Sequence, residues 1–563
     1  MADYKFPETL EAMIDDTLSP ILNRLLSTRG ITEATEVSDF LNPNYETQLH
    51  APELLHDIEK ACERIELAMK NNERIAIFSD YDCDGIPGAV VLHDFFTTIS
   101  YENFQNYIPH RHFEGFGLST KAIDQLKDDG VALVITIDCG TTNVEEIKYA
   151  KENEIDVIVT DHHEPGEVLP EAVAVVNPKL GDYPFSELCG AATVFKLVQA
   201  LLNRNDYGVG KGQEKWWLDM VGVATIADMV PLKGENRVLA HFGLQVLRKS
   251  RRPGLQQLLR KARIDQRYLT EEDIGFTIGP RINAASRMDN PEDAFFMLSE
   301  KDEGKAGERV LHLEKLNQER KTQVALMTKD LHKRLKALEE IPPVLVMGSP
   351  EWRPSLVGLA AGKLAEEYAR PAFIWGTDGN GVYKGSCRSG GGASVVKLMN
   401  SVSEVFLEHG GHHVAGGFSV KDEHIFSFGE NLVSAMVSLG EEALVKEDIV
   451  IDAEINLEDI NQFLIQELDK LAPFGAGNHK PLFVIKNVIP DSVELFGKTK
   501  EHTKLIFKTE NGKLEAISFF QKPEHFKQMP VVEVPCTLIA HVEKSYFMGR
   551  HQIRVMIVDV ISV

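Results

Sequence analysis

The chain has 563 residues, a length typical of three or four domains, and its 43% hydrophobic and 26% charged residues exclude a mainly disordered or fibrous protein. Its net charge of −25 disfavours loose adhesion to a polyanion, although a locally basic groove remains compatible with it. No C-x-x-C pair, signal-peptide pattern or apolar run of about 18 residues occurs, so we expect a cytoplasmic protein that crosses no membrane.

The N-terminal half begins with a helical, polar lead-in at 1–70, to which the sequence assigns no role. From 71 to 235, short apolar strands alternate with helices. The strand candidates lie at 75–78, 106–109, 131–137, 157–159 and 172–176, and the helix candidates at 88–98 and 144–151. This alternation is typical of an α/β domain with a parallel, doubly wound sheet.

The remainder of the chain separates into three parts. Residues 236–341 are mainly helical and predict a long helical connector. Residues 342–447 show a second, smaller α/β pattern in which glycines accumulate, and the evenly spaced short strands of 448–563 predict a small β-barrel or sandwich.

A basic run without any acidic residue occurs between Arg248 and Arg263, inside the predicted connector. It is either a solvated helix face or a patch that contacts a nucleic-acid backbone.

Acidic and imidazole side chains follow three of the predicted strands. These side chains are Asp80, Asp82 and Asp84 after the first strand, Asp138 after a second, and His162 and His163, preceded by Asp161, after a third. Crowded carboxylates repel one another unless cations neutralise them, and hard oxygen ligands suit Mg²⁺ or Mn²⁺. Because the carboxyl ends of parallel strands meet at one edge of a sheet, the three groups are expected to converge. A solvated acidic loop is the alternative for the first group.

Several other residues have two open interpretations. Asp228 follows an apolar segment and either joins the acidic groups or caps a helix. Ser386 and Arg388 alternate after Gly385, which suits a phosphate pocket, although a surface pair beside a glycine turn has the same pattern. Arg281 and Arg287 suit either contacts to a strand backbone or inter-domain salt bridges. Four aromatic residues of the last part suit either base stacking or a core, namely Phe519, Phe520, Tyr546 and Phe547.

The Asp-x-Asp-x-Asp run, Asp138 and the Asp161-His162-His163 triplet resemble the DHH phosphoesterase superfamily, and the flanking segments resemble its RecJ family of single-strand exonucleases. Those flanking segments are Glu114–Leu118, Cys189–Ala192, Asp228–Arg237, Gly279–Ala285, Lys384–Ser389, Gly410–Gly416 and Pro473–Asn478. The resemblance implies a DHH domain at 71–235, the connector at 236–341, a substrate-binding DHHA1 domain at 342–447 and an OB-type domain at 448–563.

The resemblance also implies two divalent cations, Mn²⁺ or Mg²⁺. Asp82 would hold one ion and Asp84 with His162 the other, Asp138 would bridge them, and Asp228 would complete the set. Asp80 and His163 are implied as further catalytic residues. The implied substrate-binding residues are Arg111, Ser386 and Arg388 at a 5′-terminal phosphate, together with Arg281, Arg287 and His413.

The activity that the resemblance implies is 5′-to-3′ hydrolysis of single-stranded DNA to 5′-mononucleotides, in recombination and repair. A monomer working with a single-strand binding protein and a helicase is expected. Two alternatives remain: a DHH phosphodiesterase for short oligonucleotides or cyclic dinucleotides, and a non-catalytic scaffold of the same fold. The chain departs from the family pattern at Arg353, where histidine is usual, and at Ser286 and Ser355, where glycine is usual.

Overall fold

The computed structural model describes residues 4–6, 13–377, 382–445, 449–510, 512–547 and 550–562. The chain divides into two compact units. The first unit comprises His50–Val230 and Phe242–Glu447, and the second comprises Asp3–Leu49, Pro231–His241 and Asp448–Val563. None of the described helices combines the length and the apolar character that a membrane span requires.

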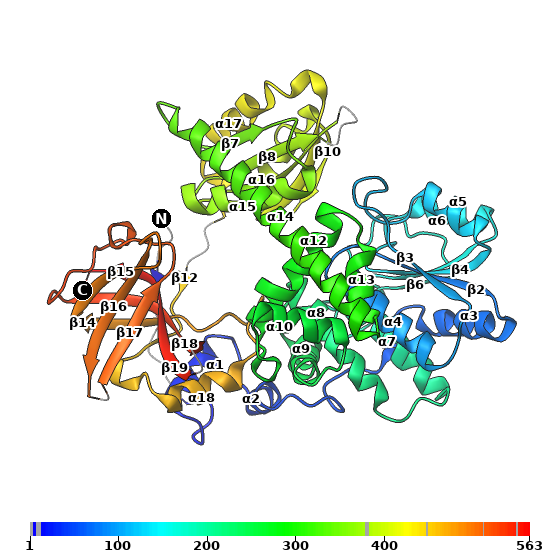
Figure 1. The fold of residues 1–563 in the computed structure, drawn as a ribbon, viewed down its shortest axis with the longest axis horizontal. Helices are drawn as coiled ribbons and strands as arrows, with labels where there is room; N and C mark the ends of the chain where they lie inside the picture. The colour runs from blue at the N-terminus through cyan, green and yellow to red at the C-terminus, as the bar shows by residue number, and fades with distance from the viewer. Residues whose placement is uncertain are drawn as a thin grey trace. The chain divides into compact units, whose positions relative to one another are not determined.

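The first unit begins with a five-stranded parallel sheet in the order β3-β2-β4-β5-β6. Its strands are β2 (Arg74–Ser79), β3 (Phe104–Tyr107), β4 (Val131–Ile137), β5 (Asp156–Thr160) and β6 (Ala174–Val176). Helices cover both faces, with α5 and α6 on one side and α3, α4 and α7 on the other (Figure 1). Those helices are α3 (Ile58–Asn71), α4 (Gly85–Thr98), α5 (Thr120–Asp128), α6 (Val144–Glu152) and α7 (Gly190–Arg204). Burial on both faces explains the near-continuous apolar strands, and the predicted doubly wound sheet is confirmed.

The strand ends of this sheet are level with one another. Ser79 is paired with Ile137, Ile137 with Thr160, and Thr160 with Val176. The ladder continues one residue further, because the next backbone N–H of each strand donates to its neighbour. These bonds run from Asp80 to Ile137 (3.1 Å), from Asp138 to Thr160 (3.0 Å) and from Asp161 to Val176 (3.1 Å). The residues that follow the strands are therefore held side by side.

The connector is helical, as predicted. Its helices are α9 (Gly234–Leu247), α10 (Pro253–Ala262), α11 (Glu271–Asp273), α12 (Gly279–Met288), α13 (Glu292–Ser299) and the 34-residue α14 (Glu303–Lys336), and α8 (Leu218–Ala227) precedes the connector in the chain. The basic run is partly structural, because the Arg252 guanidinium forms buried ion pairs with Asp94 (2.7 Å) and Asp219 (2.8 Å). Arg248 donates to the Leu269 carbonyl (2.8 Å).

A second, mixed sheet follows in the order β10-β11-β9-β8-β7, in which β7 and β8 alone are parallel. Its elements are β7 (Leu345–Gly348), α15 (Pro354–Tyr368), β8 (Ala372–Thr377), β9 (Tyr383–Arg388), α16 (Val395–Asn400), β10 (Phe406–Gly411), β11 (Ala415–Val420) and α17 (Phe428–Leu439). The predicted smaller α/β domain is therefore confirmed, with the glycine-rich stretch forming the β10–β11 hairpin.

The second unit contains a seven-stranded sheet in the order β13-β14-β18-β19-β17-β16-β15 and a two-stranded pair of β1 and β12. Its elements are β1 (Tyr4–Lys5), α1 (Pro20–Ser27), α2 (Ala34–Leu41), β12 (Ile449–Val450), β13 (Ala453–Glu454), α18 (Gln462–Leu471), β14 (Phe483–Val488), β15 (Ser492–Phe496), β16 (His502–Thr509), β17 (Gly512–Ser518), β18 (Cys536–Phe547) and β19 (Arg550–Ile561). Short 3-10 or π-helical turns of the two units are η1 (Pro52–Leu54), η2 (Gln213–Trp217), η3 (Gln266–Tyr268), η4 (Ile274–Ile278), η5 (Ser403–Val405), η6 (Asp422–His424), η7 (Gly440–Ala443), η8 (Leu457–Asp459) and η9 (Pro523–His525).

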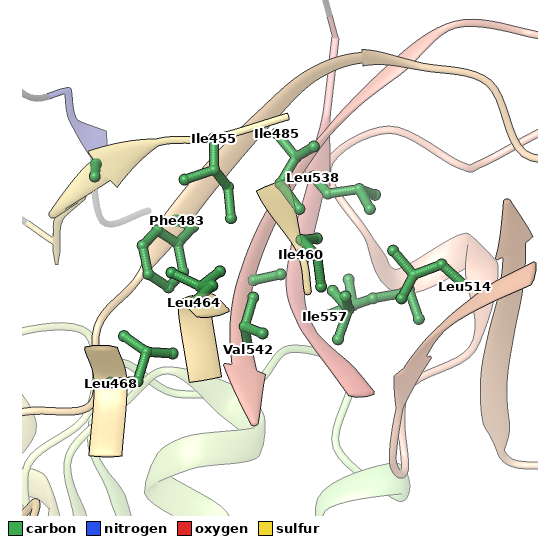
Figure 2. Close-up of a cluster of buried hydrophobic side chains, with 14 of the residues drawn as sticks. Ile455, Ile460, Leu464, Leu468, Phe483, Ile485, Leu514, Leu538, Val542 and Ile557 are labelled. Atoms are coloured by element: carbon green, nitrogen blue, oxygen red, sulfur yellow. The ribbon is translucent and has the colours of Figure 1, made fainter. Parts of the chain in front are cut away.

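The β-rich part is predicted to be a small barrel or sandwich, and its sheet does not close into a barrel, because no described strand joins β13 to β15 at the two ends of the sheet. Its core lies between the sheet and α18, where Leu464 and Leu468 point at the strands that carry Phe483 and Leu538 (Figure 2). The i, i+4 spacing of the two leucines places both on the buried face of the helix. Residues 20–41 of the lead-in contribute α1 and α2 to this unit, whereas α3 packs in the first unit.

Candidate active site

The carboxylates after β2 are enclosed. Asp80 and Asp84 are buried, and Asp82 is half-buried. The Asp84 carboxylate accepts hydrogen bonds from the backbone N–H groups of Gly190 (2.6 Å) and Ala191 (2.8 Å) at the start of α7. A helix N-terminus attracts an anion, because its first N–H groups have no partner inside the helix. Asp84 is therefore fixed by α7 as well as by its own strand end.

Asp138 is the buried carboxylate at the end of β4, and its backbone is left-handed (φ 61°). Its Oδ1 lies 3.1 Å from Nε2 of His162, which also lies 3.6 Å from Asp84 Oδ2 and 3.7 Å from Asp228 Oδ2. Among the described residues, Oδ1 of Asp80 and Oδ1 of Asp138 are buried without a hydrogen bond, because the 3.1 Å approach of His162 to Asp138 lacks hydrogen-bond geometry. Buried acceptors of this kind suit a ligand that the free chain does not supply.

The Asp161 carboxylate is held by hydrogen bonds from a histidine and from a backbone N–H. Its Oδ1 accepts from His163 Nδ1 (2.8 Å) and its Oδ2 from the Thr141 backbone N–H (3.0 Å). Burial opposes ionisation, yet these hydrogen bonds and the charge of His163 lower the pKa of Asp161. The same bond and charge outweigh burial and raise the pKa of His163. Asp161 thus orients the second histidine.

Charge crowding is strongest among the other carboxylates. Burial, followed by the neighbouring carboxylates, raises the pKa values of Asp80 and Asp138 well above the ordinary range and that of Asp228 to about 9. Burial is also the main cause of the raised pKa of Asp84. Because like charges disfavour joint ionisation, a bound cation is the natural means of keeping the group ionised near neutral pH.

Three sets of side chains lie close enough to share a metal ion, with ligand atoms within 4.8 Å of one another. They are Asp80, Asp82 and Asp138; Asp84, His162 and Asp228; and Asp138, His162 and His163. The structure therefore brings together all seven residues predicted at this edge, including Asp228, which also lies at the C-terminal end of α8.

Position 190 requires glycine because α7 begins very close to Asp138: a Cβ at Gly190 would lie 2.6 Å from Cβ of Asp138. We expect Gly190→Ala to displace Asp138 and to destabilise the protein by about 1–3 kcal/mol through overpacking. Urea denaturation measures this loss. Gly210→Ala is the matched control, because its nearest contact would be an ordinary 3.7 Å to Gln213. Equal stability of the two variants would contradict this account.

A cluster of cations lies beside the carboxylates. Arg287 donates to the Ser355 carbonyl (2.7 Å), and burial, followed by the charge of Arg111, lowers its pKa to about 10. Arg111 lies over the Tyr81 ring at 4.9 Å. Burial also lowers the pKa of Arg388. Within the described part of the chain, none of these three arginines forms an ion pair with a carboxylate, so their guanidinium groups can bind an incoming anion.

Ser386 and Arg388 share one face of β9, as their alternation predicts. A Cβ at Gly358 of α15 would lie 3.2 Å from both Ser386 Oγ and Arg388 Nη2, so the missing side chain leaves room at this pair. Arg281 is engaged elsewhere: it forms an ion pair with Glu314 and donates to the Thr277 carbonyl (2.9 Å). His413 is exposed in the β10–β11 loop, and its carbonyl accepts from the Val395 N–H (3.0 Å).

The residues that depart from the family pattern support the Arg287 segment. Arg353 donates to the Met288 carbonyl (3.0 Å), and the Ser355 hydroxyl donates to the Arg287 carbonyl (2.8 Å). Ser286 is buried and donates to the Asn283 carbonyl one turn earlier (3.3 Å). The two substitutions in the 353–355 segment thus fasten the start of α15 to the end of α12.

Sequence reasoning assigned nothing to the fourth strand end, after β6. There the buried Asn177 side chain donates to the His163 carbonyl (2.9 Å) and to the Thr141 hydroxyl (3.1 Å). Lys179 follows it and forms an ion pair with Glu164 (2.8 Å). The predicted strand at 172–176 could have indicated Asn177 and Lys179, because residues that follow a parallel strand lie at the same edge of the sheet.

The aromatic residues of the β-rich unit form a partly exposed cluster. Phe519 and Phe520 are 45% and 81% exposed, and both rings contact His502. The Phe520 backbone is left-handed (φ 57°), and its N–H donates to His502 Nδ1 (2.9 Å). The side chains of Tyr546 and Phe547, also predicted for this role, lie outside the described residues.

Three family models match the chain: the N-terminal domain of the DHH family at 74–225, the DHHA1 domain at 342–439 and the RecJ OB domain at 451–559. The parallel sheet with its acidic edge and the two following domains thus define a protein of the DHH class. The chain belongs to the RecJ family of single-stranded-DNA-specific exonucleases. The resemblance seen in the sequence is therefore confirmed.

The named relatives support this membership. The RecJ exonuclease of Salmonella typhimurium is 30% identical over 84% of this chain and 84% of its own length. That of Bacillus subtilis is 34% identical over 89% of this chain, which spans only 63% of that relative. The crystal structure of Thermus thermophilus RecJ in complex with Mn²⁺ matches 99% of this chain and 79% of its own, with 25% identity and a TM-score of 0.83.

Proposed function

We propose that this chain hydrolyses single-stranded DNA from the 5′ end, releases 5′-mononucleotides and uses two divalent cations, Mn²⁺ or Mg²⁺. The observation that carries the proposal is the juxtaposition, within one unit, of a crowded carboxylate and histidine cluster with arginines for which the described residues provide no ion-pair partner. The first group suits cations, and the second suits a phosphate. The names of the relatives, including one crystallised with Mn²⁺, agree with this combination.

The proposed ligand roles follow two of the three sets, namely Asp80, Asp82 and Asp138, and Asp84, His162 and Asp228. Asp82 would hold one ion with support from Asp80, Asp84 and His162 would hold the other with Asp228, and Asp138 would contribute to both. The ions would supply a water of lowered pKa and would neutralise charge on the phosphodiester. Asp161 keeps His163 oriented at the same edge through the 2.8 Å bond to Nδ1.

The 5′-terminal phosphate is bound by Ser386, Arg388 and Arg111, and Arg287 binds the strand backbone. A planar guanidinium matches phosphate oxygens with two parallel hydrogen bonds. Arg281 and His413 are proposed as further strand contacts, for which the Arg281 guanidinium would exchange Glu314 for a phosphate. The single-strand preference follows from bases that must separate to reach an enclosed metal centre.

The second unit contributes base stacking through Phe519 and Phe520, since exposed aromatic rings stack on any base. We also propose that the protein acts in DNA repair and recombination in the cytoplasm, as a monomer that cooperates with a single-strand binding protein and a helicase. We propose that the lead-in ends at residue 70, the DHH domain at 235, the helical connector at 341 and the DHHA1 domain at 447, where the OB-type domain follows.

Digestion of end-labelled oligonucleotides tests the function. We expect the 5′ label of single-stranded DNA to appear as a mononucleotide with Mn²⁺ or Mg²⁺ present, and duplex to resist. Parallel reactions with RNA and with a dinucleotide define the substrate. A preference for the dinucleotide favours the short-oligonucleotide phosphodiesterase, and binding without cleavage favours the scaffold.

Metal binding is expected to depend on pH. The folded-state pKa of Asp228 is about 9, whereas its ordinary value is 3.8, so the folded protein retains a proton that the unfolded chain loses. Stability of the metal-free protein therefore falls as pH rises through this interval. Because Mn²⁺ replaces such protons, the rise in Tm that it causes should be larger at about pH 8.5 than at about pH 6. Thermal scans with Mn²⁺ or a chelator measure this, and an equal or smaller rise at the higher pH would contradict it.

A further inference from the structure

Lys179 is a cation at the catalytic sheet edge that the proposed function does not use. Thr160 of β5 is paired with Val176 of β6, so residues 177–179 run beside the Asp161-His162-His163 segment. Asn177 fixes this arrangement, because its amide donates to the His163 carbonyl (2.9 Å) while its Oδ1 accepts from the Lys179 N–H (2.9 Å). The backbone of Lys179 is therefore tied to the histidines.

The ammonium of Lys179 has one ion-pair partner among the described residues. Nζ lies 2.8 Å from Oε1 of Glu164, and the two side chains are 22% and 78% exposed. The Glu164 carboxylate is largely in solvent, which screens its attraction for the ammonium. Lys179 can therefore exchange the Glu164 carboxylate for another anion at small cost.

The cations stand at different ends of the carboxylate cluster. Arg111 acts on the carboxylate of Asp80, and Arg287 is influenced by Asp82. Arg111 follows β3 and Lys179 follows β6, which are the two edge strands of the five-stranded sheet. The His162 segment runs beside Lys179, and Nε2 of His162 lies 3.6 Å from Asp84 Oδ2 and 3.7 Å from Asp228 Oδ2, so Lys179 lies toward the Asp84, His162 and Asp228 set.

Glu164, the ion-pair partner of Lys179, is also influenced by a residue of the second α/β domain. Hydrogen bonding and charge from Lys179 lower the pKa of Glu164, and His412 of the β10–β11 loop makes a smaller contribution of the same sign. Lys179 and a residue of a separate segment therefore both act on one exposed carboxylate. This is a place where a polyanion can replace that carboxylate.

We propose that the Lys179 ammonium binds the phosphate that follows the scissile phosphate in the strand. The inference rests on the proposed function. With the 5′-phosphate at the arginines and the scissile phosphate at the carboxylate cluster, the next phosphate lies toward Asp228 and His162, beside Lys179. Nζ–H then donates to a phosphate oxygen, and Glu164 is displaced. Lys179 would retain the shortened strand after each cut.

Two short substrates test this contact: a 5′-phosphorylated deoxydinucleotide, which has no phosphate beyond the scissile one, and the corresponding trinucleotide, which has one. We expect Lys179→Met to lower the trinucleotide-to-dinucleotide ratio of kcat/KM by about tenfold, the effect of losing a charged hydrogen bond. Lys179→Arg should restore most of the ratio. Lys151→Met is the matched control, because it removes the lysine of an exposed pair with Glu171 (2.9 Å) elsewhere in the unit.

A binding measurement gives a readout apart from catalysis. In an Asp138→Ala background, Lys179→Met should raise the Kd for a fluorescent trinucleotide by about tenfold. An unchanged ratio and an unchanged Kd would overturn the role of Lys179, even if the wild-type chain degrades DNA. Failure of the wild-type chain to cleave either substrate, or longer DNA, would instead overturn the proposed function itself.

Discussion

Replacing Asp138 by alanine is expected to reduce metal-dependent cleavage of single-stranded DNA by more than about 100-fold, since even residues that only support metal ligands cost 10- to 100-fold. Asp138 belongs to two of the three potential ligand sets, and its Oδ1 lies 3.1 Å from Nε2 of His162. No neighbouring side chain can take its place, because its left-handed backbone and the contact with Gly190 fix the position. Initial rates with excess Mn²⁺ measure the loss.

The same variant should remain folded. Burial and neighbouring carboxylates raise the pKa of Asp138, so its removal relieves a cost of the metal-free state. We therefore expect the Tm with chelator to stay equal or to rise, while the Mn²⁺-induced increase in Tm shrinks. Asp124→Ala on α5 is the control, because it removes a carboxylate outside the site. An Asp138→Ala protein with wild-type rates would refute the ligand assignment.

The acidic edge could be predicted from the sequence because few facts determine it. Apolar runs such as 131–137 are strands buried on both faces, and parallel strands end at one edge whatever the rest of the chain does. The side chains that follow, such as Asp80 and Asp138, therefore meet without knowledge of distant contacts. Asp228 was less certain, since the same residue also lies at the end of α8.

Other features depend on contacts that sequence spacing does not encode. Arg281 and Arg287 are six residues apart on one helix, yet the first pairs with Glu314 and the second belongs to the arginine cluster. The basic run contains Arg252, whose partners Asp94 and Asp219 come from distant helices. Whether the strands of the last sheet close into a barrel likewise depends on strand register across many residues.

Replacing Arg388 by alanine is expected to reduce the preference for 5′-phosphorylated over 5′-hydroxyl DNA by about 10- to 100-fold, because a hydrogen bond to a charged group contributes about 1.5–3 kcal/mol. Burial lowers the pKa of this guanidinium, which donates a hydrogen bond to the adjacent Cys387 carbonyl (2.8 Å). A buried cation without a carboxylate partner gains most from an incoming dianion. The ratio of kcat/KM values on the two ends measures the preference.

The effect should be confined to the terminal phosphate. The rate on 5′-hydroxyl DNA should change far less than the rate on phosphorylated DNA, because Arg388 is absent from the metal-ligand sets. Arg388→Lys should keep part of the preference, since an ammonium retains the charge but loses the planar fork. Arg267→Ala is the control, because its side chain is 75% exposed and pairs with Asp265. If Arg388→Ala slowed both substrates equally, the guanidinium would act on the scissile region, and the 5′-phosphate pocket would have to lie elsewhere.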